Sequence, residues 1–147
     1  MNVKVGYLNV EGLRRDKHQA CCSLMDCGLF DVLFLSETWF PKTYNFMSHP
    51  YSFLHSTPDK VQKNSRQSGG ILVLVSLQIR PLIRSHHVTP YGILLDLDGT
   101  NILGVYLPPS FSPWQLDSIL GAFPKYSLLF GDLNVCFKNI AAKAPSP

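Results

Sequence analysis

The chain has 147 residues, of which 46% are hydrophobic and 16% charged, a composition that excludes the intrinsically disordered class. Its net charge of +3 tolerates an anionic partner without requiring one. The longest apolar run, residues 70–75, is far too short to cross a bilayer, and the N-terminus lacks the features of a signal peptide. We therefore expect an intracellular protein, nuclear or cytoplasmic, that is neither secreted nor membrane-bound.

The first third of the chain alternates between strand and helix patterns. Residues 3–8 alternate and are rich in β-formers, which predicts a strand ending at Asn9. A helical stripe of apolar residues covers 13–27. Residues 31–36 form a continuous apolar run that predicts a strand buried on both faces and ending at Glu37.

The middle of the chain is less regular. Residues 40–68 have no sustained period, so we expect a long connection with one short strand at 51–55. Two further strands are predicted, at 71–76 and at 78–85.

A hairpin is predicted next. The apolar runs 93–97 and 101–106 flank Asp98-Gly99, and a glycine in a two-residue turn tolerates positive φ. The second strand of this hairpin ends at Tyr106, before two prolines.

The last helix should open at residues 112–115, because Ser112 and Gln115 have the spacing of a capping box. Its inner side should hold Trp114, Ile119, Leu120 and Phe123. Residues 127–131 predict another buried strand, ending at Asp132, and residues 141–147 predict a frayed tail.

This order of elements favours an α+β fold, a two-layer β-sandwich flanked by helices, over a doubly wound parallel sheet. Strands outnumber helices, and most consecutive strands lack the crossover helix that parallel pairing requires. We expect one domain over residues 1–140. The four cysteines form no CxxC pair and are expected to be reduced.

Polar residues follow several of the predicted strands, where hydrophobic patterning does not explain them. They are Asn9, Glu37, Tyr106, Asp132 and Asn134. Each alone has an ordinary structural explanation, such as a carboxylate accepting bonds from a loop backbone or an Asx-turn after a strand. Together they match a rigid sheet that delivers side chains from several strand ends to one site.

Five short motifs occur in a family's order: Gly-Tyr-Leu-Asn at 6–9, Leu-Ser-Glu-Thr-Trp at 35–39, Ser-Gly-Gly-Ile at 68–71, Tyr-Leu-Pro-Pro at 106–109 and Gly-Asp-Leu-Asn at 131–134. The chain resembles the endonuclease/exonuclease/phosphatase superfamily, which has the deoxyribonuclease I-like fold. Within it, the chain is most similar to endonucleases of LINE-type (non-LTR) retrotransposons.

The resemblance implies a role for each of the five polar residues. Glu37 would hold Mg²⁺, with Mn²⁺ as the alternative ion, and Asn9 would help to hold that metal or the scissile phosphate. Asp132 would orient and deprotonate the attacking water, Asn134 would fix the phosphate, and Tyr106 would bind its oxygens. The implied reaction is phosphodiester hydrolysis, with DNA as the partner.

The sequence departs from this family in one respect. The family completes its site with a late Ser-Asp-His segment, and no His, Asp or Glu follows Asp132 here. His86-His87 precedes that motif and is expected to be a surface pair. We therefore expect a fold that is incomplete at its C-terminus and impaired in activity. Its exposed strand edge would either leave the fold marginal or bind a protein partner.

Two alternatives to a nuclease remain open. The chain could be a non-catalytic remnant that binds metal, nucleic acid or protein, or a phosphatase of the same superfamily. Plasmid nicking with Mg²⁺ separates the first alternative from an enzyme, and phosphate release without DNA cleavage identifies the second.

Overall fold

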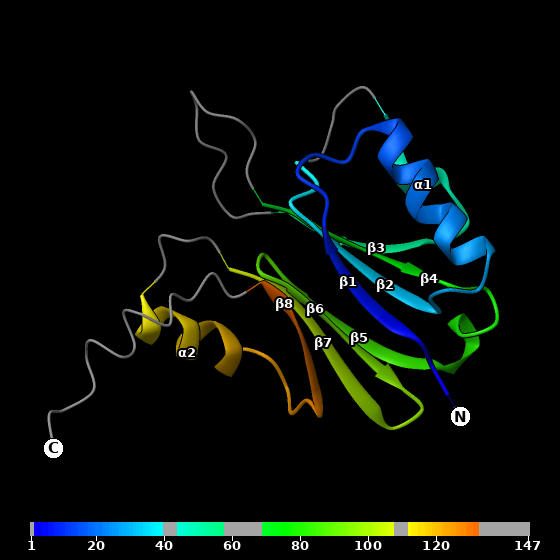
Figure 1. The fold of residues 1–147 in the computed structure, drawn as a ribbon. Coiled ribbons are helices and arrows are strands. Elements are labelled where there is room, and N and C mark those ends of the chain that lie inside the picture. The colour runs from blue at the N-terminus through cyan, green and yellow to red at the C-terminus, as the bar shows by residue number, and fades with distance from the viewer. Residues whose placement is uncertain (1, 40–43, 58–68, 108–111, 133–147) are drawn as a thin grey trace, which may run out of the picture.

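The computed structural model describes residues 2–39, 44–57, 69–107 and 112–132, and they form two four-stranded sheets (Figure 1). Across the first sheet, the order is β1 (Val5–Asn9), β2 (Val32–Ser36), β4 (Ile71–Val75) and β3 (Ser52–Ser56). Across the second sheet, it is β5 (Ile83–Thr89), β6 (Gly92–Leu97), β7 (Thr100–Tyr106) and β8 (Leu128–Asp132). In each sheet one pair is parallel, β1 with β2 and β7 with β8, and the other pairs are antiparallel.

The main core lies between the two sheets, where inward-facing side chains of β2 and β4 meet those of β6 and β7. Phe34 of β2 is fully buried, and its ring lies directly against Gly104 of β7. A side chain at Gly104 would overlap that ring, so this glycine allows the sheets to approach each other. All five residues of β2 are buried, as the uninterrupted apolar run predicts.

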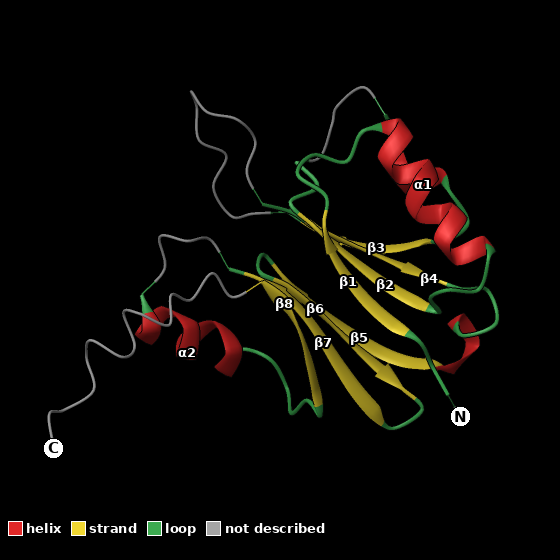
Figure 2. Cartoon of the chain, in the orientation of Figure 1, coloured by secondary structure: helices red, strands yellow, loops and turns green. Residues whose placement is uncertain are grey.

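A helix covers the outer face of each sheet (Figure 2). Helix α1 (Arg15–Asp26) packs on the first sheet through a second core cluster that includes Cys21, Cys22 and Met25. Helix α2 (Pro113–Gly121) packs on the second sheet, with Ile119 and Leu120 beside a smaller cluster. Two short 3₁₀ helices, η1 (Phe46–Ser48) and η2 (Arg80–Leu82), complete the described elements.

The structure confirms the α+β class, with mixed sheets and few helices, and most of the predicted elements. The hairpin between β6 and β7 turns at Asp98-Gly99, where both residues have positive φ. At the start of α2, the side-chain oxygen of Gln115 accepts a hydrogen bond from the Ser112 backbone N–H at 2.7 Å, as expected of a capping box. The predicted tail lies outside the described residues.

Three details of the prediction are wrong. Residues 78–82 form a turn and η2 instead of a strand, since Pro81 lacks the N–H that a ladder needs, and the strand instead covers Ile83–Thr89. Trp114 is 71% exposed instead of lining the inner side of α2. Strand β8 is not buried, because it is the edge of its sheet and exposes Leu128 and Leu129.

None of the helices in the described ranges has the length and apolar character needed to span a membrane.

Candidate active site

Four of the five predicted site residues gather at one end of the two sheets. Asn9, the last residue of β1, pairs with Ser36 at the end of β2, and Glu37 follows directly. In the other sheet Tyr106, the last residue of β7, pairs with Asp132, the last residue of β8. Because each pair is parallel, the carboxyl ends of β1 and β2 lie together in one sheet, and those of β7 and β8 lie together in the other. Asn134 lies outside the described residues.

One hydrogen bond joins the two halves of this site. The Tyr106 hydroxyl, from the second sheet, donates to a carboxylate oxygen of Glu37, from the first sheet, at 2.7 Å. Tyr106 is buried, and its pKa is raised by that burial, by this hydrogen bond and by the nearby carboxylates of Glu37 and Asp132. The phenol therefore stays protonated at neutral pH and acts as a hydrogen-bond donor.

The backbone at Glu37 is strained and held on both sides. Its φ of 54° lies in the left-handed region, which costs a residue other than glycine about 1–3 kcal/mol. The Gly12 N–H donates to the Glu37 carbonyl at 2.7 Å, and the next residue, Thr38, donates its N–H to the Gly70 carbonyl at 3.3 Å. Two loops that are far apart in the sequence thus hold the backbone at Glu37, which carries the carboxylate.

Asn9 has a more local role. Its side-chain oxygen accepts a hydrogen bond from the Glu11 backbone N–H at 3.1 Å, which stabilises the turn after β1. The side chain also borders a recess of about 400 Å³ between β1 and α1. That lining is mainly apolar and includes Leu8, Ala20 and Leu24.

Three buried hydroxyls that the sequence analysis did not single out lie around Glu37. The hydroxyls of Tyr7, Ser36 and Thr38 are buried without a completed hydrogen bond among the residues that the structure describes. The Tyr7 hydroxyl lies near Ser36 and the Asp132 main chain, and burial raises its pKa to about 12, so it too stays neutral. Tyr7 could have been found from the sequence, because it lies two residues before Asn9 and therefore shares one face of β1 with it.

The donor set fits a hard cation. Within the ranges of the chain that are described, no group of three or more His, Cys, Asp and Glu side chains could hold a metal ion. Glu37 and Asp132 each lie close enough to the Tyr106 hydroxyl to raise its pKa, and Asn9 ends the strand next to β2. Mg²⁺ is commonly bound by one or two carboxylates together with water and substrate phosphate, so these oxygen donors are of the kind that Mg²⁺ takes.

The histidine pair lies elsewhere. His86 and His87 are exposed on β5, where their rings contact Phe53 and Phe123. Of the four cysteines, Cys21, Cys22 and Cys27 are free thiols, and Cys136 lies outside the described residues.

Solved structures share this fold, and two of them are described here. The chain matches an AP endonuclease from Archaeoglobus fulgidus with a TM-score of 0.60 and 13% identity, over 91% of this chain and 58% of that one. It matches a 3′ phosphatase from Neisseria, solved with a product DNA hairpin, with a TM-score of 0.57 and 15% identity, over 91% and 58% of the two chains. No family model matches the sequence, and no curated protein gives a significant match. The chain thus spans less than two thirds of the two solved proteins, with which it shares the fold.

Proposed function

We propose that this chain hydrolyses phosphodiester bonds in DNA with the help of Mg²⁺, in the manner of a retrotransposon endonuclease. The observation that carries the proposal is the Tyr106–Glu37 hydrogen bond, which joins the ends of two sheets beside the carboxylate of Asp132. The two matched structures are an AP endonuclease and a DNA 3′ phosphatase, so the same fold supports phosphoester chemistry on DNA in other proteins. The retrotransposon assignment rests on the five sequence motifs.

Each described site residue has a role in this proposal. Glu37 would hold the metal with the support of Asn9, and the Tyr106 hydroxyl holds Glu37 in its orientation. Asp132 accepts a proton from the attacking water. When bound, Mg²⁺ stabilises the negative charge that develops on the phosphoryl group. Asn134 stays a prediction for contact with the phosphate.

The position of Tyr106 refines the role that the family resemblance implies for it. Its hydroxyl donates to Glu37 and is buried, so in this structure it supports the carboxylate instead of presenting a free donor to phosphate. Groups that orient a ligating carboxylate typically change metal affinity by about 10–100-fold when removed.

The experiment is a nicking assay on supercoiled plasmid with Mg²⁺, using the wild-type chain and the Glu37→Gln and Asp132→Asn variants. We expect slow nicking by the wild type and none by either variant. No histidine follows Asp132 in these 147 residues, and losing one transition-state donor typically costs about 10²–10³ in rate.

The control is Asp98→Asn, which removes an exposed carboxylate at the opposite end of β7 from Tyr106. This variant should nick as fast as the wild type. Nicking by all four proteins at one rate would contradict the proposal, because the activity would then not come from this site. An oligonucleotide ending in a 3′ phosphate tests the phosphatase alternative, which requires phosphate release without plasmid nicking.

A further inference from the structure

A second tyrosine reaches the candidate site from the first sheet. Tyr7 lies in the middle of β1, and its ring packs against the main core between the two sheets. Side chains alternate along a strand, so Leu8 points away from that core and is 43% exposed. Tyr7 therefore faces the second sheet, as does Val5.

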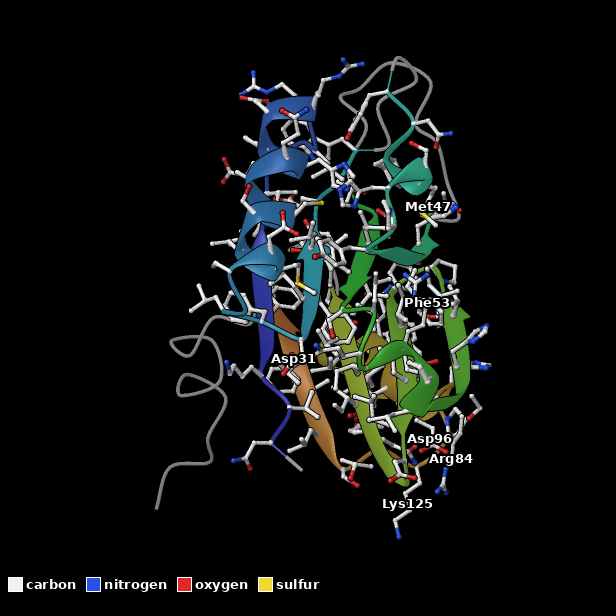
Figure 3. All side chains as sticks on the ribbon, turned by 90° about the vertical axis from the view of Figure 1, so that its right-hand side faces the viewer. Asp31, Met47, Phe53, Arg84, Asp96 and Lys125 are labelled. Carbon is white, nitrogen blue, oxygen red and sulfur yellow. The ribbon has the colours of Figure 1, made fainter. Side chains whose placement is uncertain are left out.

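The strand that Tyr7 meets there is β8. Among the strands that the structure describes, β1 and β8 stand at the ends of their sheets and contact each other (blue and orange in Figure 3). Phe130 of β8 packs against the same core, so Asp132, two residues further along, points to the same side. The Tyr7 hydroxyl is buried beside the Ser36 side chain and the Asp132 main chain.

This arrangement mirrors the contact made by Tyr106. Tyr106 extends from the second sheet to Glu37 in the first, and Tyr7 extends from the first sheet to Asp132 in the second. The two carboxylates differ in their other support. Backbone hydrogen bonds to two loops hold Glu37, whereas Asp132 ends a strand that pairs, among the described strands, with β7 alone. The end of β8 therefore depends more on a contact from the opposite sheet.

We propose that Tyr7 is a positioning residue for Asp132, because its hydroxyl holds the last residue of β8 from the opposite sheet. The inference rests on the proposed function, in which the Asp132 carboxylate accepts a proton from the attacking water. A displacement of about 1 Å at a reacting group can cost about 10²-fold in rate, so the position of this main chain matters for the reaction.

Tyr7 acts by its position and not by proton transfer. Burial raises the pKa of its hydroxyl to about 12, and the nearby carboxylates of Asp132 and Glu37 add to this effect. The phenol therefore keeps its proton across the neutral range and does not serve as a base. Removal of the hydroxyl should change the reaction rate by the same factor at every pH in that range.

The first test compares Tyr7→Phe with a matched tyrosine variant in plasmid nicking and in Mg²⁺ binding. Tyr7→Phe keeps the ring in the core and removes the hydroxyl, so kcat should fall about tenfold, as for the loss of one hydrogen bond. The KM for plasmid and the Mg²⁺ dissociation constant should stay unchanged, because Glu37 keeps its bond from Tyr106. Tyr126→Phe is the control, because Tyr126 precedes the other end of β8, and it should change none of these constants.

Three outcomes of this test would overturn the inference. One is an unchanged kcat in Tyr7→Phe. Another is a loss of Mg²⁺ affinity as large as that of Tyr106→Phe, because Tyr7 would then act on the metal site. The third is a ratio of wild-type to Tyr7→Phe rates that varies with pH, which would indicate proton transfer by the phenol.

Hydrogen exchange tests the hold on β8 without any need for activity. The Leu107 N–H donates to the Asp132 carbonyl at 2.9 Å, at the site end of β8. The Ser127 N–H donates to the Asn101 carbonyl at 3.0 Å, at the other end. Tyr7→Phe should speed exchange at Leu107 about tenfold and leave exchange at Ser127 unchanged.

The two tests separate this inference from the proposed function. A wild-type chain that does not nick DNA would refute the proposed function, and faster exchange at Leu107 in Tyr7→Phe would still support the hold of Tyr7 on β8. Nicking by the wild type together with unchanged exchange at Leu107 in this variant would overturn the inference and leave the proposed function in place. Urea unfolding verifies that each variant is folded.

Discussion

The two helix–sheet layers differ in how deeply their side chains are buried. The first sheet and α1 enclose a cluster of buried side chains, and its strand β2 is buried along its whole length. The second sheet and α2 share a smaller cluster, and β8 is an exposed edge. Yet each layer supplies one carboxylate, Glu37 from the first and Asp132 from the second. The strained Glu37 thus belongs to the more buried layer, and Tyr106 connects it to the more open one.

The largest expected effect comes from removing the contact between the layers. Phe34→Ala should destabilise the fold by about 3–5 kcal/mol, because the fully buried ring leaves a cavity against Gly104. Phe130→Ala, in the edge strand β8, should cost less, because Phe130 is only partly buried in the same core. Urea unfolding of both variants measures this, and equal losses would contradict the difference in burial between β2 and β8.

The next effect concerns pH and belongs to the first layer. His18 of α1 is fully buried. Its Nε2 lies 3.3 Å from the Ser52 hydroxyl, which already donates to the Phe46 carbonyl. Nε2 must therefore donate, and Nδ1 accepts from the Tyr44 hydroxyl, so the ring is neutral. Burial, and to a lesser degree His49, lowers the pKa of His18 to about 4.

The sign of this effect follows from proton binding. Below pH 6.5 the unfolded chain binds a proton at His18, whereas the folded chain binds this proton only below about pH 4. The stabilisation is complete above pH 6.5 and should be lost as the pH falls to 4, a loss of about 3 kcal/mol. Urea midpoints between pH 7 and 4 measure it. His18→Gln should flatten the profile, and His86→Gln, on exposed β5, should not.

A smaller effect tests the bond between the layers. Tyr106→Phe removes the donor to Glu37 and should weaken Mg²⁺ binding by about 10–100-fold, as measured by calorimetry. Tyr51→Phe is a matched control, since it removes an exposed tyrosine–carboxylate hydrogen bond to Asp26. Equal Mg²⁺ affinities of the two variants would show that Tyr106 does not support a metal site.

The smallest expected effect concerns the second layer, formed by β5 to β8 and α2. Trp114→Ala should change the free energy of unfolding by no more than about 0.5 kcal/mol, because the ring is largely exposed on α2. A loss of several kcal/mol would mean that Trp114 is covered, and the second layer would then be less open than the structure shows.

Local pattern was enough to locate most elements. The hairpin at Asp98-Gly99 and the capping box at Ser112 were predictable because each depends on a few neighbouring residues. The strand predicted at 78–85 was misplaced, since its apolar residues resemble a strand while Pro81 prevents the ladder. The exposure of β8 could not be predicted, because an apolar run looks the same in a central strand and at an edge.

The sequence alone determined which polar residues stand at the ends of the strands, because the apolar segments stop at Asn9, Glu37, Tyr106 and Asp132. Only the tertiary structure decided that these ends meet and that Tyr106 donates to Glu37 across the two sheets. It also decided that, among the strands the structure describes, β1 and β8 stand at the ends of their sheets. The reason is that strand order and sheet packing depend on contacts between residues far apart in the chain, which no local pattern encodes.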